Sequence, residues 1–88
     1  MKRIWKYKIK VTNESTIEMP QGAKILCVQV QGGIPNIWVL VDSVLPTEVR
    51  TFTVIGTGRL VPDERSMEYI GSFQLVNGNF VGHLFEKV

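Results

Sequence analysis

Polar and apolar residues alternate along most of the chain, and turn residues interrupt this alternation about every eight to fourteen positions. Alternation with a period of about two is typical of β-strands, because successive side chains in a strand point to opposite faces. No segment shows the period of about 3.6 residues that predicts a helix. The pattern predicts strands at about residues 3–11, 15–19, 23–31, 37–41, 49–57, 68–76 and 79–86. We expect an all-β fold, a small single-domain antiparallel sandwich or partly open barrel of about six to seven strands.

Proline and glycine mark the turns between these strands. Residues 19–22, Met-Pro-Gln-Gly, predict a type I turn with proline at its second position, where the fixed φ of proline fits. Residues 45–48 predict the turn into the fifth strand. Asn77-Gly78 predicts a two-residue type I′ hairpin turn, which needs positive φ at both central positions. Residues 58–66 are the longest irregular stretch.

The length of the chain limits its stability. At 88 residues we expect one domain, 1–88, because a chain of this size buries only roughly 60 to 65% of its unfolded surface. Residues 37–41 form an unbroken apolar run, which indicates a central strand covered on both faces or a strand at a subunit contact. Trp38 and its neighbours at 34–37 are either core or interface. We therefore expect a homo-oligomer.

The first predicted strand separates two kinds of side chain. One face carries the apolar residues expected in the core, Trp5, Tyr7, Ile9 and Val11. The other face carries Lys6, Lys8 and Lys10. We interpret the lysine face first as a soluble edge that discourages pairing with another chain, and second as a surface for an anionic ligand or a nucleic acid. A single-strand binder needs aromatic and basic side chains on one surface, and this strand separates them, so nucleic acid is the less favoured partner.

Composition excludes several classes of protein. The net charge of +2 is too small to indicate a nucleic-acid partner by itself. Cys27 and His83 are the sole cysteine and histidine, so they form neither an internal disulfide nor a zinc ligand set, and we expect no metal and no cofactor. No apolar run approaches the ~20 residues of a membrane span, so we expect a soluble, cytoplasmic protein with no membrane partner.

Gly56-Thr57-Gly58-Arg59 is the best candidate for an anion site. Glycines let backbone amides approach an anion, and an arginine supplies a bidentate fork for it. The segment lacks the length of a Walker loop and precedes no convincing helix, so neither the P-loop nor the dinucleotide fingerprint applies. The alternative is a bulge or a strand-ending turn, which glycine in a strand usually marks.

No set of residues predicts catalysis. A nucleophilic pair of Cys27 and His83 would need its two strands to meet and an orienting partner. Glu68 and Glu86 have no fixed sequence relation that would make them an acid–base pair. The chain has no Gly-x-Ser-x-Gly elbow and no His-Glu-x-x-His motif. We expect no catalytic residues and no enzymatic activity.

Six segments together resemble a family of short uncharacterised proteins of phage and prophage genomes. They are IWKY at 4–7, IEMPQGAKIL at 17–26, WVLVD at 38–42, GTG at 56–58, YIGSFQ at 69–74 and HLFE at 83–86. In that family Gly-Thr-Gly is usually followed by histidine, whereas this chain has Arg59, a permanent cation. The resemblance implies a phage origin and an accessory role in the infected host cell, and by analogy a role against host defence.

Two functions stay open from the sequence. The first is a non-enzymatic, oligomeric binding protein that sequesters a small anionic, nucleotide-like ligand. Its ligand-binding residues would be Gly56, Thr57, Gly58 and Arg59 with Lys6 or Lys8 for phosphate, and Trp38 or Tyr69 for a stacked base. The second is a protein-interaction module that inhibits a host protein through a strand edge or the apolar residues 34–38. Nucleic-acid binding through the lysine face ranks third.

Overall fold

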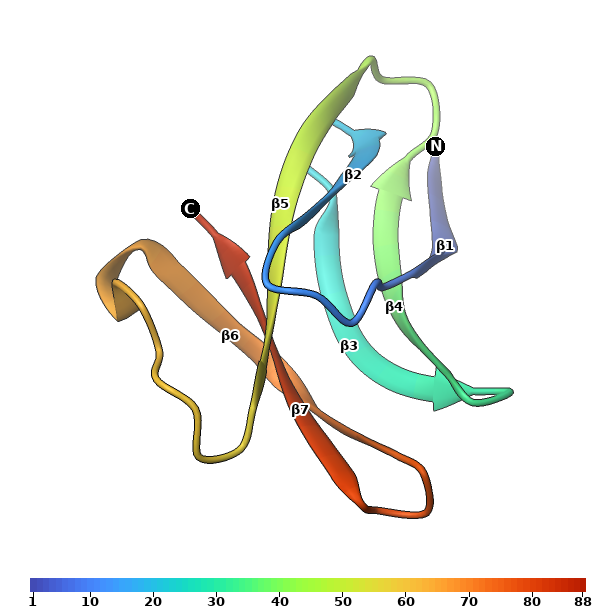
Figure 1. The fold of residues 1–88 in the computed structure, drawn as a ribbon. Coiled ribbons are helices and arrows are strands. Elements are labelled where there is room, and N and C mark those ends of the chain that lie inside the picture. Colours follow the sequence, from blue (N-terminus) through green and yellow to red (C-terminus); the bar gives the residue numbers. More distant parts are fainter.

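The computed structural model describes residues 1–88 and contains seven strands and one short 3-10 turn (Figure 1). The elements are β1 (Lys2–Lys8), β2 (Ser15–Pro20), β3 (Lys24–Gln31), β4 (Ile34–Asp42), β5 (Thr47–Gly56), η1 (Glu64–Ser66), β6 (Met67–Leu75) and β7 (Phe80–Lys87). The all-β prediction is confirmed, and the predicted strands are all present with ends shifted by a few residues. No helix is long and apolar enough to cross a membrane.

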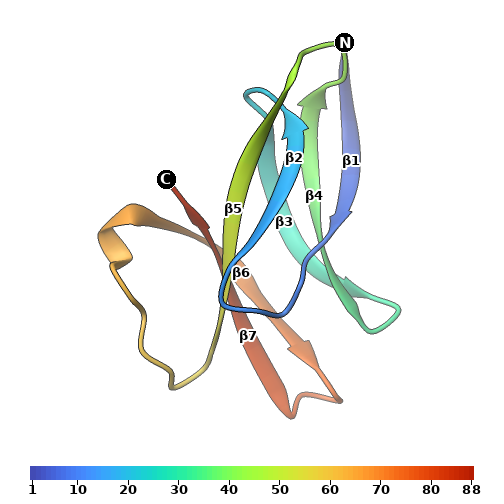
Figure 2. The same ribbon diagram turned by 45° about the horizontal axis from the view of Figure 1, so that its top comes forward.

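The strands form two antiparallel sheets. One sheet has the order β1-β4-β3, and the other has the order β2-β5-β7-β6. Figures 1 and 2 show β2 and β5 lying over the three-stranded sheet, while the β6–β7 hairpin extends beyond it. The edge strands β3 and β6 contact each other, so the two sheets also meet along one side. The result is a small sandwich that is partly closed at that side.

The core lies between the inner faces of the two sheets. Ile37, Val39 and Val41 of β4 are fully buried, and they face Phe52 of β5 and Leu84 of β7 in one cluster. Each of these side chains contributes about 1.5–3 kcal/mol through the apolar surface that it removes from water. The apolar run at 37–41 is therefore explained by a central strand. Its outward side chains, Trp38 and Leu40, are only half-buried within one chain.

The prediction that the whole apolar face of the first strand enters the core is wrong at two positions. Ile9 is 3% exposed and Tyr7 packs against the core, but Trp5 is 38% and Val11 is 47% exposed. Trp5 lies on the inner side of β1 opposite Val39, yet β1 is the edge of its sheet and no strand covers its outer flank. Val11 lies beyond the end of β1, in the loop to β2.

Three turns differ from the sequence prediction. The amide of Ala23 donates to the Pro20 carbonyl, and φ of Gly22 is +72°, so the turn spans 20–23 with glycine third, as in type II. The chain reverses after β4 at residues 42–45, where the Leu45 amide donates to the Asp42 carbonyl, and not at 45–48 as predicted. In the β6–β7 hairpin the loop has four residues, 76–79, and positive φ begins one residue early, at Val76.

Candidate functional site

A groove beside β5 follows from the order of the strands. β5 and β6 both pair with β7 in antiparallel fashion, so they run parallel to each other and need a crossover connection. β5 ends at Gly56, opposite Gly82, whereas β6 begins at Met67, opposite Lys87. Residues 57–66 must therefore run back along β7 from the level of Gly82 to the level of Lys87. These positions are five residues apart, a distance of roughly 17 Å at ~3.4 Å per residue. Figure 1 shows this loop standing away from β5 and β7.

The groove has a volume of about 910 Å³ and mixes apolar and polar walls. Its apolar wall includes Leu60, Pro62, Met67 and Phe80, and its polar wall includes residues 12–14, Thr53, Arg59 and Lys87. Lys87 is paired with Glu14 at 2.7 Å. The Arg59 guanidinium makes no hydrogen bond and no ion pair, so it is the cation of this groove whose charge is not neutralised.

Two features of β5 shape the inner end of the groove. Thr53 is 5% exposed, and its hydroxyl is buried with no hydrogen-bond partner. A buried hydroxyl without a partner is costly, by about 1–3 kcal/mol, and is expected to have a role or a missing partner. Gly56 lies close to the Arg59 side chain, because a Cβ at Gly56 would lie 3.7 Å from Arg59 Cγ and 3.4 Å from Phe80. These are ordinary contact distances, so the Arg59 side chain packs over the strand at Gly56.

Thr57 is held by a hydrogen-bonded chain across the four-stranded sheet. Its hydroxyl lies 2.8 Å from Nε2 of His83, and the other ring nitrogen of His83 lies 2.9 Å from the Tyr69 hydroxyl. Every group is satisfied when Tyr69 donates to Nδ1, Nε2–H donates to Thr57, and Thr57 donates to the Val81 carbonyl at 3.3 Å. In that arrangement the threonine proton points away from the imidazole. This series of hydrogen bonds therefore fixes the 56–59 turn and does not activate Thr57 as a nucleophile.

A family model described as "Domain of unknown function (DUF7352)" matches residues 1–88. The chain belongs to this family. The resemblance to a family of uncharacterised proteins is thereby confirmed at the level of the family. No curated protein and no solved structure matches the DUF7352 chain.

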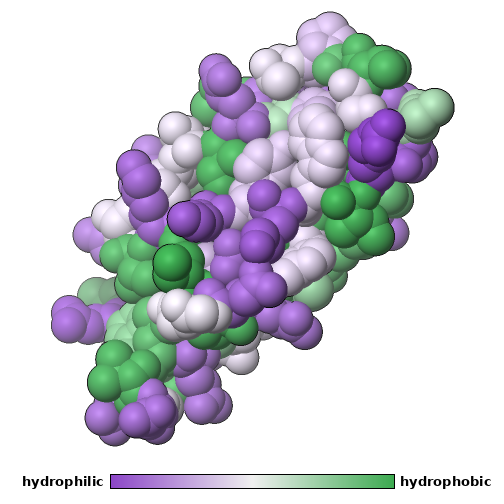
Figure 3. Space-filling model, turned by 90° about the vertical axis from the view of Figure 1, so that its right-hand side faces the viewer, coloured by the Kyte–Doolittle hydropathy of each residue, from purple (hydrophilic) through white to green (hydrophobic).

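The structure distributes the eight predicted ligand-binding residues of this DUF7352 chain over two surfaces. Gly56, Gly58 and Arg59 line the groove, and Thr57 lies between them in the chain. Tyr69 is joined to Thr57 through His83, but its side chain lines a different cavity. Lys6, Lys8 and Trp38 instead lie on the outer face of the three-stranded sheet. Figure 3 views the side on which β1 lies in Figure 1, where hydrophilic and hydrophobic side chains are interspersed. Within one chain, the residues at the groove and those on the three-stranded sheet therefore do not share a pocket.

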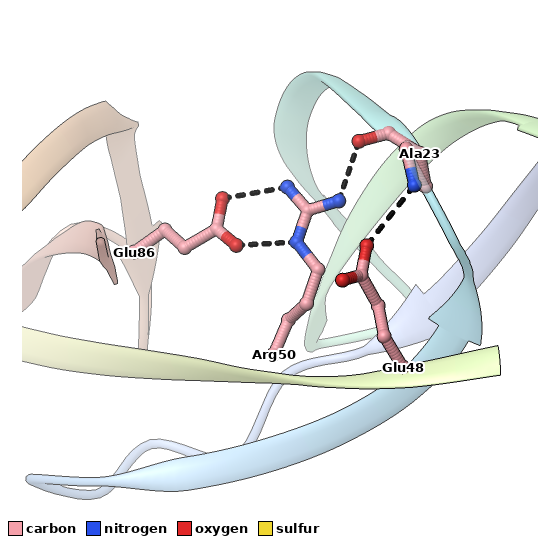
Figure 4. A network of polar contacts seen from close by, with 5 residues as sticks. Ala23, Glu48, Arg50 and Glu86 are labelled. Carbon is pink, nitrogen blue, oxygen red and sulfur yellow. Dashed lines mark hydrogen bonds and ion pairs between the residues drawn. The ribbon is translucent and has the colours of Figure 1, made fainter.

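A second polar network of the DUF7352 chain joins the two sheets (Figure 4). Arg50 of β5 makes a two-pronged contact with the Glu86 carboxylate, with Nη2 to Oε1 at 2.8 Å, and also donates to the Ala23 carbonyl just before β3. The hydrogen bond to Glu86 raises the pKa of Arg50 above its usual value. Glu48 nearby accepts the Gly22 amide at 3.0 Å. Arg50 and Glu86 line a second cavity of about 430 Å³, where each neutralises the charge of the other.

Sequence reasoning missed Thr53, the His83 chain and the Arg50–Glu86 pair. Glu86 carried a detectable signal, because it alternates with Gly82 and Leu84 on the inner face, where a carboxylate needs a partner. Glu68 lies directly opposite Glu86 in the β6–β7 register, a relation that no sequence spacing indicated. Cys27 and His83 belong to different sheets and are not paired, so the structure provides no Cys–His nucleophile.

Proposed function

We propose that the protein is a non-enzymatic binding module that holds a small anionic, nucleotide-like ligand in the groove beside β5. The observation that carries the proposal is the combination of an unpaired Arg59 guanidinium with the buried, unpartnered hydroxyl of Thr53 in one groove. A phosphate oxygen accepts hydrogen bonds from both groups, and an arginine fork suits two oxygens of one phosphate.

The remaining walls favour a ligand with an apolar or aromatic part. Leu60, Pro62 and Phe80 line the groove together with the aliphatic part of Met67. The volume of about 910 Å³ lies within the range of ~300–1,000 Å³ that holds small molecules, and such sites are apolar with a few polar groups. A nucleotide satisfies both requirements, since it presents a flat base and at least one phosphate. In this proposal Tyr69 and His83 position the turn and do not contact the base.

The biological setting is part of the proposal. The family resemblance supports a phage accessory protein in the cytoplasm of the infected host cell, where sequestration of a nucleotide signal would counter host defence. Self-association is supported by edge strand β1, whose Ile4 and Trp5 are 61% and 38% exposed. The rival idea, capture of a host protein by residues 34–38, loses support because Pro35 and Ile37 are buried, which leaves only Ile34 and the half-buried Trp38 as accessible apolar side chains of that segment.

Native mass spectrometry of the protein from its expression host tests whether a ligand and an oligomer are present. We expect a small adduct that is lost on denaturation. Titration calorimetry with ADP, and with adenosine as the uncharged probe, then tests the need for phosphate. ADP should bind and adenosine should not, and Arg59→Ala should weaken ADP binding by about tenfold or more without lowering the melting temperature.

Arg65→Ala is the matched control, because Arg65 is an exposed arginine of the same connection that does not line the groove. It should leave ADP binding unchanged. Equal binding of ADP by the Arg59→Ala variant and the unmodified protein would refute the assignment of this groove. Absence of both an adduct and ADP binding would refute the nucleotide-like ligand class.

A further inference from the structure

The outer face of the three-stranded sheet brings an aromatic ring and lysines together. Side chains that lie directly opposite each other in an antiparallel pair point to the same face. Lys6 lies opposite Trp38, and Lys8 lies opposite Asn36. Because Ile37, Val39 and Val41 fill the core, Trp38 and both lysines point outward. Within β1 the aromatic and basic side chains lie on opposite faces, but the neighbouring strand β4 supplies an aromatic ring, Trp38, on the lysine face.

The charge of this face is strongly one-sided. Four lysines lie on it, Lys2, Lys6 and Lys8 from β1 and Lys24 from β3. None of the four is in an ion pair. Lys6 donates to Gln31 at 2.7 Å, but the amide oxygen is neutral and leaves the positive charge intact. The single acid of the face, Asp42, is paired with the amino-terminal ammonium at 2.9 Å, and that hydrogen bond lowers the pKa of Asp42.

A buried acceptor without a partner lies in the same place. Asn36 is 3% exposed, its amide nitrogen donates to Ile34, and its Oδ1 has no hydrogen bond. Lys6 lies opposite Trp38 and Gln31 lies opposite Ile34, so the hydrogen bond between Lys6 and Gln31 crosses β4 at Asn36. A movement of Lys6 toward a phosphate would break this hydrogen bond over Asn36, whose Oδ1 is the acceptor that an N–H group of a base would need.

We propose that this face is a binding platform for single-stranded nucleic acid. Trp38 offers one face of its indole to a base, and Lys6 and Lys8, whose Cα atoms are roughly 7 Å apart, follow the phosphates. Asn36 accepts a hydrogen bond from an N–H group of a base, such as the ring N–H of thymine or uracil. The platform lies on a different sheet from the Arg59 groove, so it does not depend on the function proposed for that groove.

Fluorescence anisotropy with labelled oligonucleotides tests the platform. The probes are oligo(dT) and oligo(U) of about 15 nucleotides, with a DNA duplex of equal length. We expect both single strands to bind more tightly than the duplex, with a slope of log K against log salt of about −2 to −3 for three to four contacts. A preference between oligo(dT) and oligo(U) identifies the natural strand. Equal affinity for the duplex would refute a platform that works by stacking.

Two charge-reversal variants test whether binding depends on this surface or only on the net charge of the protein. Lys8→Glu should weaken oligo(dT) binding by about tenfold or more and flatten the salt dependence. Arg65→Glu makes the same change in net charge on an exposed residue away from this sheet, and should change affinity less than about twofold. Similar losses in the two variants would overturn the proposal.

Tryptophan fluorescence tests the stacking contact directly. Oligo(dT) should quench the emission of the Trp5→Phe variant, in which Trp38 is the remaining tryptophan. Trp38→Leu keeps an apolar side chain and should lower affinity by about tenfold, the loss expected for one stacked base. Undiminished affinity in a folded Trp38→Leu variant would overturn the role of Trp38. Arg59→Ala should bind oligo(dT) normally, which separates this platform from the groove.

Discussion

Truncation of Arg50 tests how much one largely buried side chain stabilises the fold, since Arg50 pairs with Glu86 inside the four-stranded sheet and also donates to Ala23, just before β3 of the other sheet. The side chains of Arg50 and Glu86 are 17% and 10% exposed, and Arg50 also satisfies the Ala23 carbonyl. Arg50→Ala leaves a carboxylate nearly buried without a cation and removes the donor for that carbonyl. Breaking one partner of a buried pair costs about 3–5 kcal/mol. Because Arg50 retains some exposure, we expect the lower end, about 3 kcal/mol.

This loss is large relative to the whole stability of the protein. A chain of 88 residues has an unfolding free energy of roughly 4–13 kcal/mol at ~0.05–0.15 kcal/mol per residue. A loss of about 3 kcal/mol should lower the melting temperature by roughly 12–24 °C, since ~1 kcal/mol shifts a domain of this size by about 4–8 °C. Urea unfolding followed by tryptophan fluorescence measures the free energy directly.

Two further variants test whether the loss of stability in Arg50→Ala comes from leaving a largely buried charge without a partner. Arg50→Met with Glu86→Leu removes both charges and should be more stable than Arg50→Ala, because no charge is left without a partner. Lys87→Ala breaks the exposed pair with Glu14 and should cost less than about 1 kcal/mol. If Arg50→Ala costs no more than Lys87→Ala, the Arg50–Glu86 pair behaves as a surface pair, and the reasoning about burial is wrong.

Three other changes test the packing, a turn and one titration. Gly82→Ala should cost about 1–3 kcal/mol in urea unfolding, because its Cβ would lie 2.6 Å from Cζ of the buried Phe73 ring. Val76→Asn should raise the unfolding free energy by about 1 kcal/mol, because φ is +53° and asparagine tolerates that conformation better than a β-branched residue; no gain would refute the strain. Burial raises the pKa of Tyr7 above 10.0, so its contribution to stability is present below pH 10.0 and is lost as pH rises through the higher folded value. Tyr7→Phe should therefore lose less stability between pH 9 and pH 11 than the unmodified protein, measured by urea unfolding at each pH.

Local alternation was enough to predict most of the strands, because each of them exposes one face and buries the other. β4 was predicted from a different signal, since its unbroken apolar run at 37–41 indicated a central strand, and its inner side chains are fully buried. Turn positions were less predictable. Proline and glycine marked the region of each turn, but the strand register set its bounds, since Leu75 pairs with Phe80 and positive φ begins at Val76.

Predicting the whole candidate site required knowing which strands are neighbours, and the sequence of one strand does not give this. The Gly56–Arg59 segment was found because glycine and arginine are themselves the chemistry of an anion site. Thr53 was missed, because its hydroxyl became significant only when the crossover made a groove beside it. The proximity of Trp38 to Lys6 was missed for the same reason. It follows from the pairing of β1 with β4, and strand order is not encoded in alternation.

The crossover at 57–66 makes the ligand preference of this fold readily changeable. Its two ends are held by the β5–β7 and β6–β7 ladders, whereas few backbone hydrogen bonds join its interior to the rest of the protein. Doubling the length of such a loop costs only about 0.6 kcal/mol in closure entropy. Insertions and substitutions there can remodel one wall of the groove while the sheets keep their register. The segment is therefore a natural position for diversification between relatives, and the first place to randomise in a library for new ligands.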